Sequence, residues 1–385
     1  MKKNMNIIIY TYMGVNILQK LADILANAVL TVYLLAKGFS YVEITVFWSV
    51  YLASVCIFDF PSGAFADRIG RVKSYYGGVF LSAISYIILL ISFKRYGYIC
   101  SYFIKGIGTA LMSGSLHAWF GSEFSHEQYK KYLGRIKLYE IVIIVPVVLA
   151  LTTIKEASAE NILYIVIVIQ IIMGICAAII LPDNKGAIDT YFKVSIAGLK
   201  NVFSTKALIL GLSMSIVSYV LFTVFNLFWQ PYAVNIGVKL SFFPLLSAIN
   251  IFISSATSYV ISRLKIPPFV CMNISYSFFV AGFLSLLWKS ENNILGLICF
   301  WVLYSVASGV LFITISCIIN ENADNNNKAT VFSVISSVCS LITIVFQPVV
   351  GVLMQEGYSV LFTATLGVLC VVIVISNLMA YGRKK

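Results

Sequence analysis

Charged side chains are scarce in this chain. They make up 11% of its 385 residues, whereas hydrophobic residues make up 60%. A water-soluble fold could not cover so much apolar side chain with so few charged groups, so the composition excludes a soluble globular protein. We therefore predict an all-α polytopic membrane protein without a sizeable soluble domain.

Residue types that serve catalysis and metal binding are also few. The chain has two histidines, and its eight cysteines stand singly in apolar segments, without the short paired spacing of a zinc or iron–sulfur site. Such cysteines are small apolar fillers, and no disulfide is implied. We expect no enzyme activity, no metal and no cofactor. A membrane enzyme or receptor is the alternative from another class.

Acidic residues are outnumbered by basic ones, which leaves a formal net charge of +12. The 27 lysines and arginines are spread over short loops rather than gathered on one surface, so nucleic acid is not an expected partner. Most of them fall on the side of the N-terminus when the apolar segments are threaded through a membrane. Because cytoplasmic loops carry the excess of lysine and arginine, we expect a bacterial cytoplasmic membrane with both termini inside.

Long apolar segments fill most of the chain. A membrane-spanning helix needs about 20 apolar residues. The segments that meet this requirement are 7–36, 44–65, 74–93, 97–120, 136–154, 160–181, 207–231, 240–262, 268–288, 293–319, 329–354 and 358–380, which predicts twelve spans. The first one has no convincing cleavage site, so we interpret it as an uncleaved span rather than a signal peptide.

The longest connection, residues 182–206, separates six predicted spans from six. Its apolar residues recur at the spacing of an amphipathic helix, which predicts a short helix lying on the inner membrane surface. The expected domains are an N-terminal six-helix bundle at 1–181 and a C-terminal six-helix bundle at 207–385, joined by this linker.

A cluster of charge and turn residues lies between the second and third predicted spans. It contains Gly63, Asp67, Arg68, Gly70, Arg71 and Lys73, and it follows Asp59-Phe60-Pro61-Ser62. The spacing resembles the signature loop of the major facilitator superfamily, with Val72 where a further basic residue is usual. A weaker copy at 258–265 agrees with two halves related by duplication. By itself, a positively charged loop is also what any inner-membrane protein has on its cytoplasmic side.

The resemblance implies twelve transmembrane helices in two pseudo-symmetric six-helix bundles that alternate access to a central cavity. Glu123 resembles the acid that pairs with the loop arginine in family members. The residues implied in this conformational, rather than catalytic, cluster are Asp59, Gly63, Asp67, Arg68, Gly70, Arg71, Lys73 and Glu123.

Span one carries polar residues where a membrane helix should be apolar. Asn16, Lys20, Asp23 and Asn27 stand three or four residues apart, so they share one stripe of the helix. Span one lines the cavity in the superfamily, so the resemblance implies a substrate or proton site, with Asp23 taking up the proton. The alternative is that Lys20 and Asp23 neutralise each other within a packed helix.

Span four carries another buried charge. Members of the superfamily often have an arginine where Tyr102 stands, and Lys105 lies one turn later. We predict that Lys105 is a partner for substrate or for Asp23. His117 is predicted to be a packed residue, with a proton carrier as the alternative.

The second half has no comparable buried charge. Its polar stripes are uncharged: Asn226 and Gln230 on span seven, and Asn250 and Ser258 on span eight among others. Cavity lining and interhelical hydrogen bonds are equally open explanations for these stripes. Aromatic residues near the expected cavity would suit a bulky or partly apolar substrate, with interfacial or core packing as the alternative for several of them; they are Tyr33, Trp48, Tyr51, Phe222, Phe225, Trp229 and Tyr304.

The predicted function is secondary active transport of a small organic molecule, most simply proton-coupled efflux of a drug, antibiotic or amphipathic metabolite. The Lys328-Ala329-Thr330 start of span eleven resembles bacterial exporters, although span five has Pro146 without the flanking glycines of drug–proton antiporters. The alternative is an uptake symporter or uniporter for an organic anion, with Lys20 and Lys105 as the binding cations. We expect a monomer whose partners are its substrate and the lipid bilayer, driven by the proton gradient.

Overall fold

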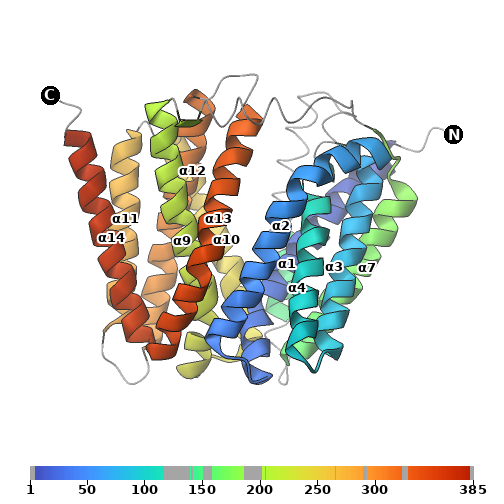
Figure 1. Ribbon diagram of the computed structural model, residues 1–385, viewed down its shortest axis with the longest axis horizontal. Coiled ribbons are helices and arrows are strands. Elements are labelled where there is room, and N and C mark those ends of the chain that lie inside the picture. Colours follow the sequence, from blue (N-terminus) through green and yellow to red (C-terminus); the bar gives the residue numbers. More distant parts are fainter. Residues whose placement is uncertain are drawn as a thin grey trace. The chain divides into compact units, whose positions relative to one another are not determined.

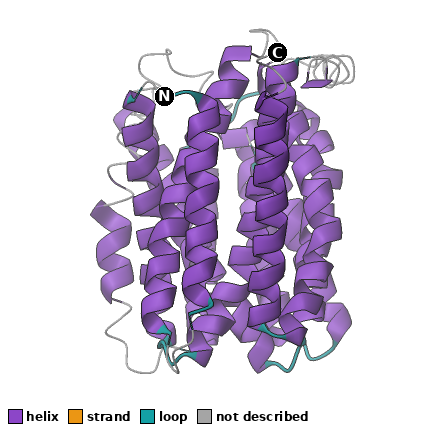
Figure 2. Ribbon diagram, turned by 90° about the vertical axis from the view of Figure 1, so that its left-hand side faces the viewer, coloured by secondary structure: helices purple, strands orange, loops and turns teal. Residues whose placement is uncertain are grey.

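The computed structural model describes residues 5–113, 115–116, 119, 139, 142–150, 158–185, 202–203, 205–264, 266–288, 293–322 and 328–381. Within these ranges short loops connect helices, and no strand is present (Figure 2). The α-helices, labelled in Figure 1, are α1 (Met5–Ala36), α2 (Tyr41–Ile69), α3 (Arg71–Ile91), α4 (Arg95–Met112), α7 (Ala159–Ile180), α9 (Lys206–Asn235), α10 (Phe243–Arg263), α11 (Pro268–Leu286), α12 (Ile294–Asn322), α13 (Lys328–Glu356) and α14 (Tyr358–Tyr381). A short 3-10 helix, η1 (Leu240–Phe242), precedes α10.

Nine helices in the described ranges are long and apolar enough to cross a membrane. The prediction of an all-α polytopic membrane protein is therefore confirmed. Each predicted span corresponds to one helix, except that 136–154 is only partly described, with 142–150 helical. For that reason, the number of twelve spans stays a prediction.

The connection between α2 and α3 is shorter than the sequence suggests. The signature residues up to Ile69 belong to α2, and α3 begins at Arg71, so the chain reverses at Gly70 alone. Gly70 has a φ of 132°, a conformation that side chains disfavour. Phe65 to Ile69 contains no helix-breaking residue, which explains why the helix continues through the motif.

Contacts divide the chain into two compact units. Unit 1 comprises Met1–Phe39, Glu43–Tyr191 and Leu240–Ala248, and unit 2 comprises Ser40–Val42, Phe192–Lys239 and Ile249–Lys385. The predicted domain limits, 1–181 and 207–385, stay a prediction. Most of the predicted amphipathic helix in 182–206 lies outside the described residues.

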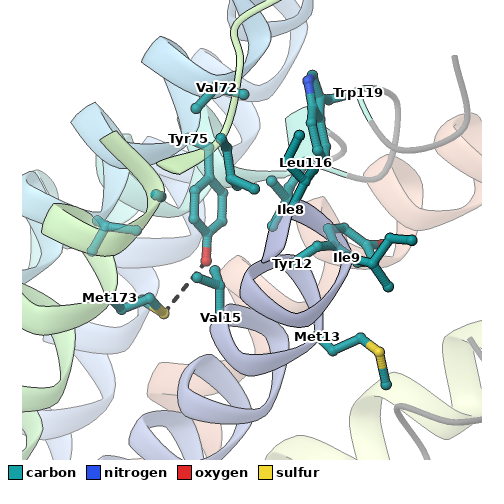
Figure 3. Close-up of a cluster of buried hydrophobic side chains, with 13 residues drawn as sticks. Ile8, Ile9, Tyr12, Met13, Val15, Val72, Tyr75, Leu116, Trp119 and Met173 are labelled. Carbon is teal, nitrogen blue, oxygen red and sulfur yellow. Dashed lines mark hydrogen bonds between the residues drawn. The ribbon is translucent and has the colours of Figure 1, made fainter. Parts of the chain in front are cut away.

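Unit 1 is built around α1, which packs on α7, while α3 packs on both α4 and α7. Buried apolar side chains from these helices meet in one cluster (Figure 3). Tyr75 of α3 lies at its centre and donates its hydroxyl to Gln19 (2.8 Å) and to the Met173 sulfur (3.4 Å). The hydroxyl is therefore satisfied inside the unit, as a buried polar group in a membrane protein must be.

In the described part of unit 1, two ion pairs besides Lys73–Asp183 join helix ends. Lys37, just after α1, contacts Glu160 at 2.8 Å, and Arg95 contacts Glu43 at 2.6 Å. The hydrogen bond to the Glu160 carboxylate raises the pKa of Lys37. Because both pairs are exposed, each contributes less than about 1 kcal/mol to stability.

Unit 2 has an aromatic interior. Rings from α9, α11 and α12 pack against one another, and Phe225 and Tyr304 are stacked with centroids 4.1 Å apart. Polar groups of α10 bond to α12: the Asn250 amide donates to the Ser305 hydroxyl (2.9 Å), and the Ser258 hydroxyl donates to the Gly309 carbonyl (2.8 Å). For these residues, interhelical hydrogen bonding is the observed role.

The first helix of each half ends in the same way. After α1, the N–H groups of Gly38 and Phe39 donate back to Leu35 and Leu34. After α9, the N–H groups of Gly237 and Val238 donate back to Val234 and Ala233 in the same pattern. Both glycines have a φ of 85°, so both ends form the Schellman motif.

Candidate functional site

The polar stripe of α1 lies on the side of the helix that unit 1 leaves open. Asp23 and Asn27 are exposed and Asn16 and Lys20 are half-buried, whereas the intervening apolar residues are buried. A carboxylate on the lipid side of a membrane helix costs several kcal/mol, so the open side of α1 must face water or protein. The stripe therefore marks the part of unit 1 that is accessible to a solute.

Asp23 interacts electrostatically with Lys20 of its own helix and with Lys105 of α4. In the described part of the chain, the ion pairs within 4.0 Å do not include Asp23. The carboxylate is therefore surrounded by positive charge without being tied to one partner. Such an arrangement leaves both oxygens accessible to a proton or a solute.

Lys105 lies among three aromatic rings. Its Nζ is 5.0 Å from the centroid of Tyr86, 5.1 Å from Trp48 and 5.4 Å from Tyr51. A cation over an aromatic face gains roughly 0.5–2 kcal/mol, depending on how far water is excluded. We call Lys105, Trp48, Tyr51 and Tyr86 the lysine box.

The lysine box is held by contacts between α2 and α4. The Ser54 hydroxyl donates to the Phe103 carbonyl (2.8 Å), and the Tyr51 hydroxyl donates to Thr109 (3.4 Å). Thr109 in turn donates to the carbonyl of Lys105 (2.9 Å). Sequence reasoning named Trp48 and Tyr51 among the aromatic residues near the expected cavity but did not name Tyr86, since Tyr86 approaches Lys105 only through the packing of α3 on α4.

The predicted residues of α9 belong to unit 2. Asn226 donates its amide to the Phe222 carbonyl of the same helix (2.9 Å), and Gln230 is 2% exposed. A buried Gln230 is not open to a solute in this conformation. Asn226 is half-buried and more accessible.

The signature cluster is anchored by an acid that sequence reasoning missed. Oδ1 of Asp183, just after α7, accepts the N–H of Val72 (2.9 Å), and its Oδ2 lies 3.6 Å from the Lys73 ammonium. The N–H of Arg71 donates to the Asn184 carbonyl (3.0 Å). The N-cap of α3, Gly70, has no capping side chain, so Asp183 caps this helix from a distant part of the sequence.

Other members of the predicted cluster are only partly described. Asp59 is exposed on α2, and Arg68 is exposed at its end. The surroundings of Gly63 and the Asp67 side chain are not described, and Glu123, His117 and Glu140 lie outside the described residues. The predicted pairing of Glu123 with the loop arginine therefore stays a prediction.

Replacing Asp183 with alanine should destabilise the protein by about 1–2 kcal/mol, lowering Tm by roughly 2–8 °C, because α3 loses its cap and Lys73 its partner. Thermal unfolding of the purified protein in detergent measures this shift. Glu160→Ala, which breaks an exposed ion pair, is the matched control and should shift Tm less. Equal shifts for both variants would contradict the capping role.

Apolar helices long enough to cross a membrane, together with intramembrane charges on an open helix side, define a multi-span solute transporter. The sequence model of the Major Facilitator Superfamily matches residues 11–348, and the chain belongs to this family. The family match indicates a transporter rather than an enzyme.

Similar proteins agree with this assignment. The chain is 21% identical over 213 residues to the uncharacterized MFS-type transporter YxaM of Bacillus subtilis (strain 168), a match covering 53% of each chain. Among solved structures, the nucleoside transporter NupG is similar with a TM-score of 0.75 at 14% identity, over 98% of this chain and 99% of that one. A mutant of the peptide transporter POT in complex with sulfate has a TM-score of 0.76 at 14% identity, over 97% and 94%. At this identity the likeness is one of fold.

Proposed function

We propose that this chain moves a small organic molecule across the bacterial cytoplasmic membrane by alternating access, with coupling to protons through Asp23. The observation that carries the proposal is the open, charged side of α1, where Asp23 interacts with lysines on two helices. Ionisable groups inside a membrane protein commonly mark ion and substrate pathways.

The coupling follows from the charge of Asp23. The ionised carboxylate attracts Lys105 of α4, and protonation removes that attraction. Each proton bound at Asp23 neutralises one charge, so the balance of forces between α1 and α4 depends on whether the proton is present. A change of this kind can favour one access state over the other.

Two directions of transport have separate support. Export of an amphipathic compound in exchange for protons is favoured by the exporter-like sequence at Lys328 to Thr330. Uptake of an organic anion is favoured by the two lysines near Asp23. NupG and POT are named for nucleosides and peptides, and their low identity leaves the substrate of this chain open.

The remaining parts of the proposal concern the setting of the protein. We place both termini in the cytoplasm, because most lysines and arginines fall in the loops on that side. We propose a monomer, since the fold of this family needs no second copy to complete its cavity, and we assign no cofactor beyond the proton gradient.

Proteoliposomes that contain a pH-sensitive dye test this proposal. A panel of antibiotics, dyes and organic anions is added outside, and a transported compound should produce proton movement that empty liposomes do not show. The sign of the pH change separates exchange from co-transport. Uptake of a labelled compound without any proton movement would contradict the coupling, and transport of no compound would contradict the function.

A further inference from the structure

One residue of the lysine box is buried, and the other three are partly exposed. Tyr86 is 3% exposed, whereas Trp48, Tyr51 and Lys105 are half-buried. Three rings therefore surround the ammonium, while the Lys105 residue as a whole stays partly exposed. A ligand can approach Lys105 without displacing the buried ring of Tyr86.

The ring of Tyr102 packs against Trp48 of the lysine box. The side chain of Tyr102 is 1% exposed, and its hydroxyl has no hydrogen-bond partner among the described residues. Its ring contacts Trp48 at a centroid distance of 5.4 Å and Phe47 at 5.8 Å. An unpaired buried hydroxyl costs about 1–3 kcal/mol, so an acceptor brought to it would be bound favourably.

The charges around the box do not balance. Asp23 interacts with two lysines, Lys20 and Lys105, and Lys105 interacts with no second carboxylate in the described part of the chain. One positive charge is therefore left over in a weakly solvated place. A bound monoanion would neutralise it, whereas a bound cation would add to it.

We propose that the lysine box and Tyr102 form a subsite for the carboxylate of a planar organic monoanion. The carboxylate accepts a charge-assisted hydrogen bond from Lys105 and a second one from the Tyr102 hydroxyl. The planar body of the ligand lies against the half-buried rings of Trp48 and Tyr51. This inference rests on the proposed function, since it names the substrate class of the same site.

Protonation of Asp23 and binding of the anion should favour each other. Neutral Asp23 leaves both lysines without their carboxylate, which increases the attraction for an anion. The titratable and charged groups that interact with Asp23 are Lys20, Tyr51, Tyr75, Tyr86 and Lys105. Of these only the lysines are charged at neutral pH, so the sign of the effect does not depend on the tyrosines.

Binding of three ligands with one shared ring system tests the subsite. Radiolabelled 1-naphthoate, 1-naphthamide and 1-naphthylmethylamine are an anion, a neutral compound and a cation, and each is measured on the full protein in nanodiscs by equilibrium dialysis. Wild-type protein should prefer 1-naphthoate by about tenfold or more, as expected for a charge-assisted hydrogen bond.

The variants separate the parts of the subsite. Lys105→Gln should remove the preference, and Lys105→Arg should retain most of it. Tyr102→Phe should weaken 1-naphthoate about three- to tenfold without lowering Tm, because no protein partner is lost. Lys94→Gln, on the exposed start of the same helix, is the matched control and should bind like wild type.

Several results would overturn the subsite. These are an unchanged preference in Lys105→Gln, a preference for the amine in wild-type protein, or no binding of either planar anion, 1-naphthoate or benzoate. If proteoliposomes still transport neutral or cationic compounds in that case, the subsite fails and the proposed function stands. If no compound of either panel is bound or transported, both fail.

Discussion

Asp23→Asn should abolish substrate-induced proton movement, reducing it by about 100-fold or to the level of empty liposomes. Asparagine has nearly the same shape as aspartate but cannot take up a proton. It also leaves Lys20 and Lys105 without the negative charge that faces them. The measurement is the dye signal in proteoliposomes with a compound that wild-type protein transports.

A second assay distinguishes lost coupling from lost folding. Exchange of labelled for unlabelled substrate across the membrane needs no net proton transfer, so Asp23→Asn should keep measurable exchange while losing proton movement. Asp23→Glu restores a carboxylate and should recover part of the signal. Glu356→Gln, at the exposed end of α13, is the control and should behave as wild type.

Unchanged proton movement in Asp23→Asn would mean that Asp23 has a structural role. The search for the proton carrier would then move to His117 and Glu140, which lie outside the described residues. Anion binding at the lysine box could survive that result, because Lys105 and Tyr102 do not require Asp23 to titrate.

Gly70→Ala should be the most destabilising single-methyl change in the loop between α2 and α3. A Cβ at this position would overlap the Asp183 carboxylate, and the φ of 132° is unfavourable for alanine. Backbone strain and loss of the cap together should cost about 3 kcal/mol, lowering Tm by roughly 6–12 °C. Thermal unfolding in detergent measures the shift, and transport should fall with it.

A second glycine provides an unusually close control. Gly357, between α13 and α14, has the same φ of 132° but nothing within 4 Å of its would-be Cβ. Gly357→Ala therefore introduces the backbone strain alone and should lower the stability less than Gly70→Ala does. In an Asp183→Ala background the overlap is gone, so Gly70→Ala should be less harmful there. Similar Tm shifts for Gly70→Ala and Gly357→Ala would contradict the role of Asp183.

The membrane fold was predictable because hydropathy acts locally. A run of about 20 apolar residues has few options other than a span, so helix positions could be read from the sequence with small errors at their ends. The reversal at Gly70 was predicted too broadly, because charge and glycine content do not tell where a helix stops. The partner of α3, Asp183, is 111 residues away from Val72, and no local pattern announces such a contact.

The candidate site was predictable only in part for the same reason. Lys20 and Asp23 lie on one helix, so spacing alone indicated that they share one side. Lys105 stood out as a charge in an apolar segment. Tyr86 and Tyr102 did not, because their significance depends on which helices pack together and on a missing hydrogen-bond partner.

The matching ends of α1 and α9 also indicate which of their residues are interchangeable. Lys37-Gly38-Phe39 and Ile236-Gly237-Val238 share only the glycine, yet the same backbone path and the same hydrogen bonds follow each helix. A left-handed backbone position tolerates little besides glycine, so the glycine is the one residue that both ends must share. The flanking side chains are free to differ, because the hydrogen bonds that close each helix come from the backbone alone. A substitution of Gly38 or Gly237 should therefore disturb the helix end more than a substitution of either neighbour.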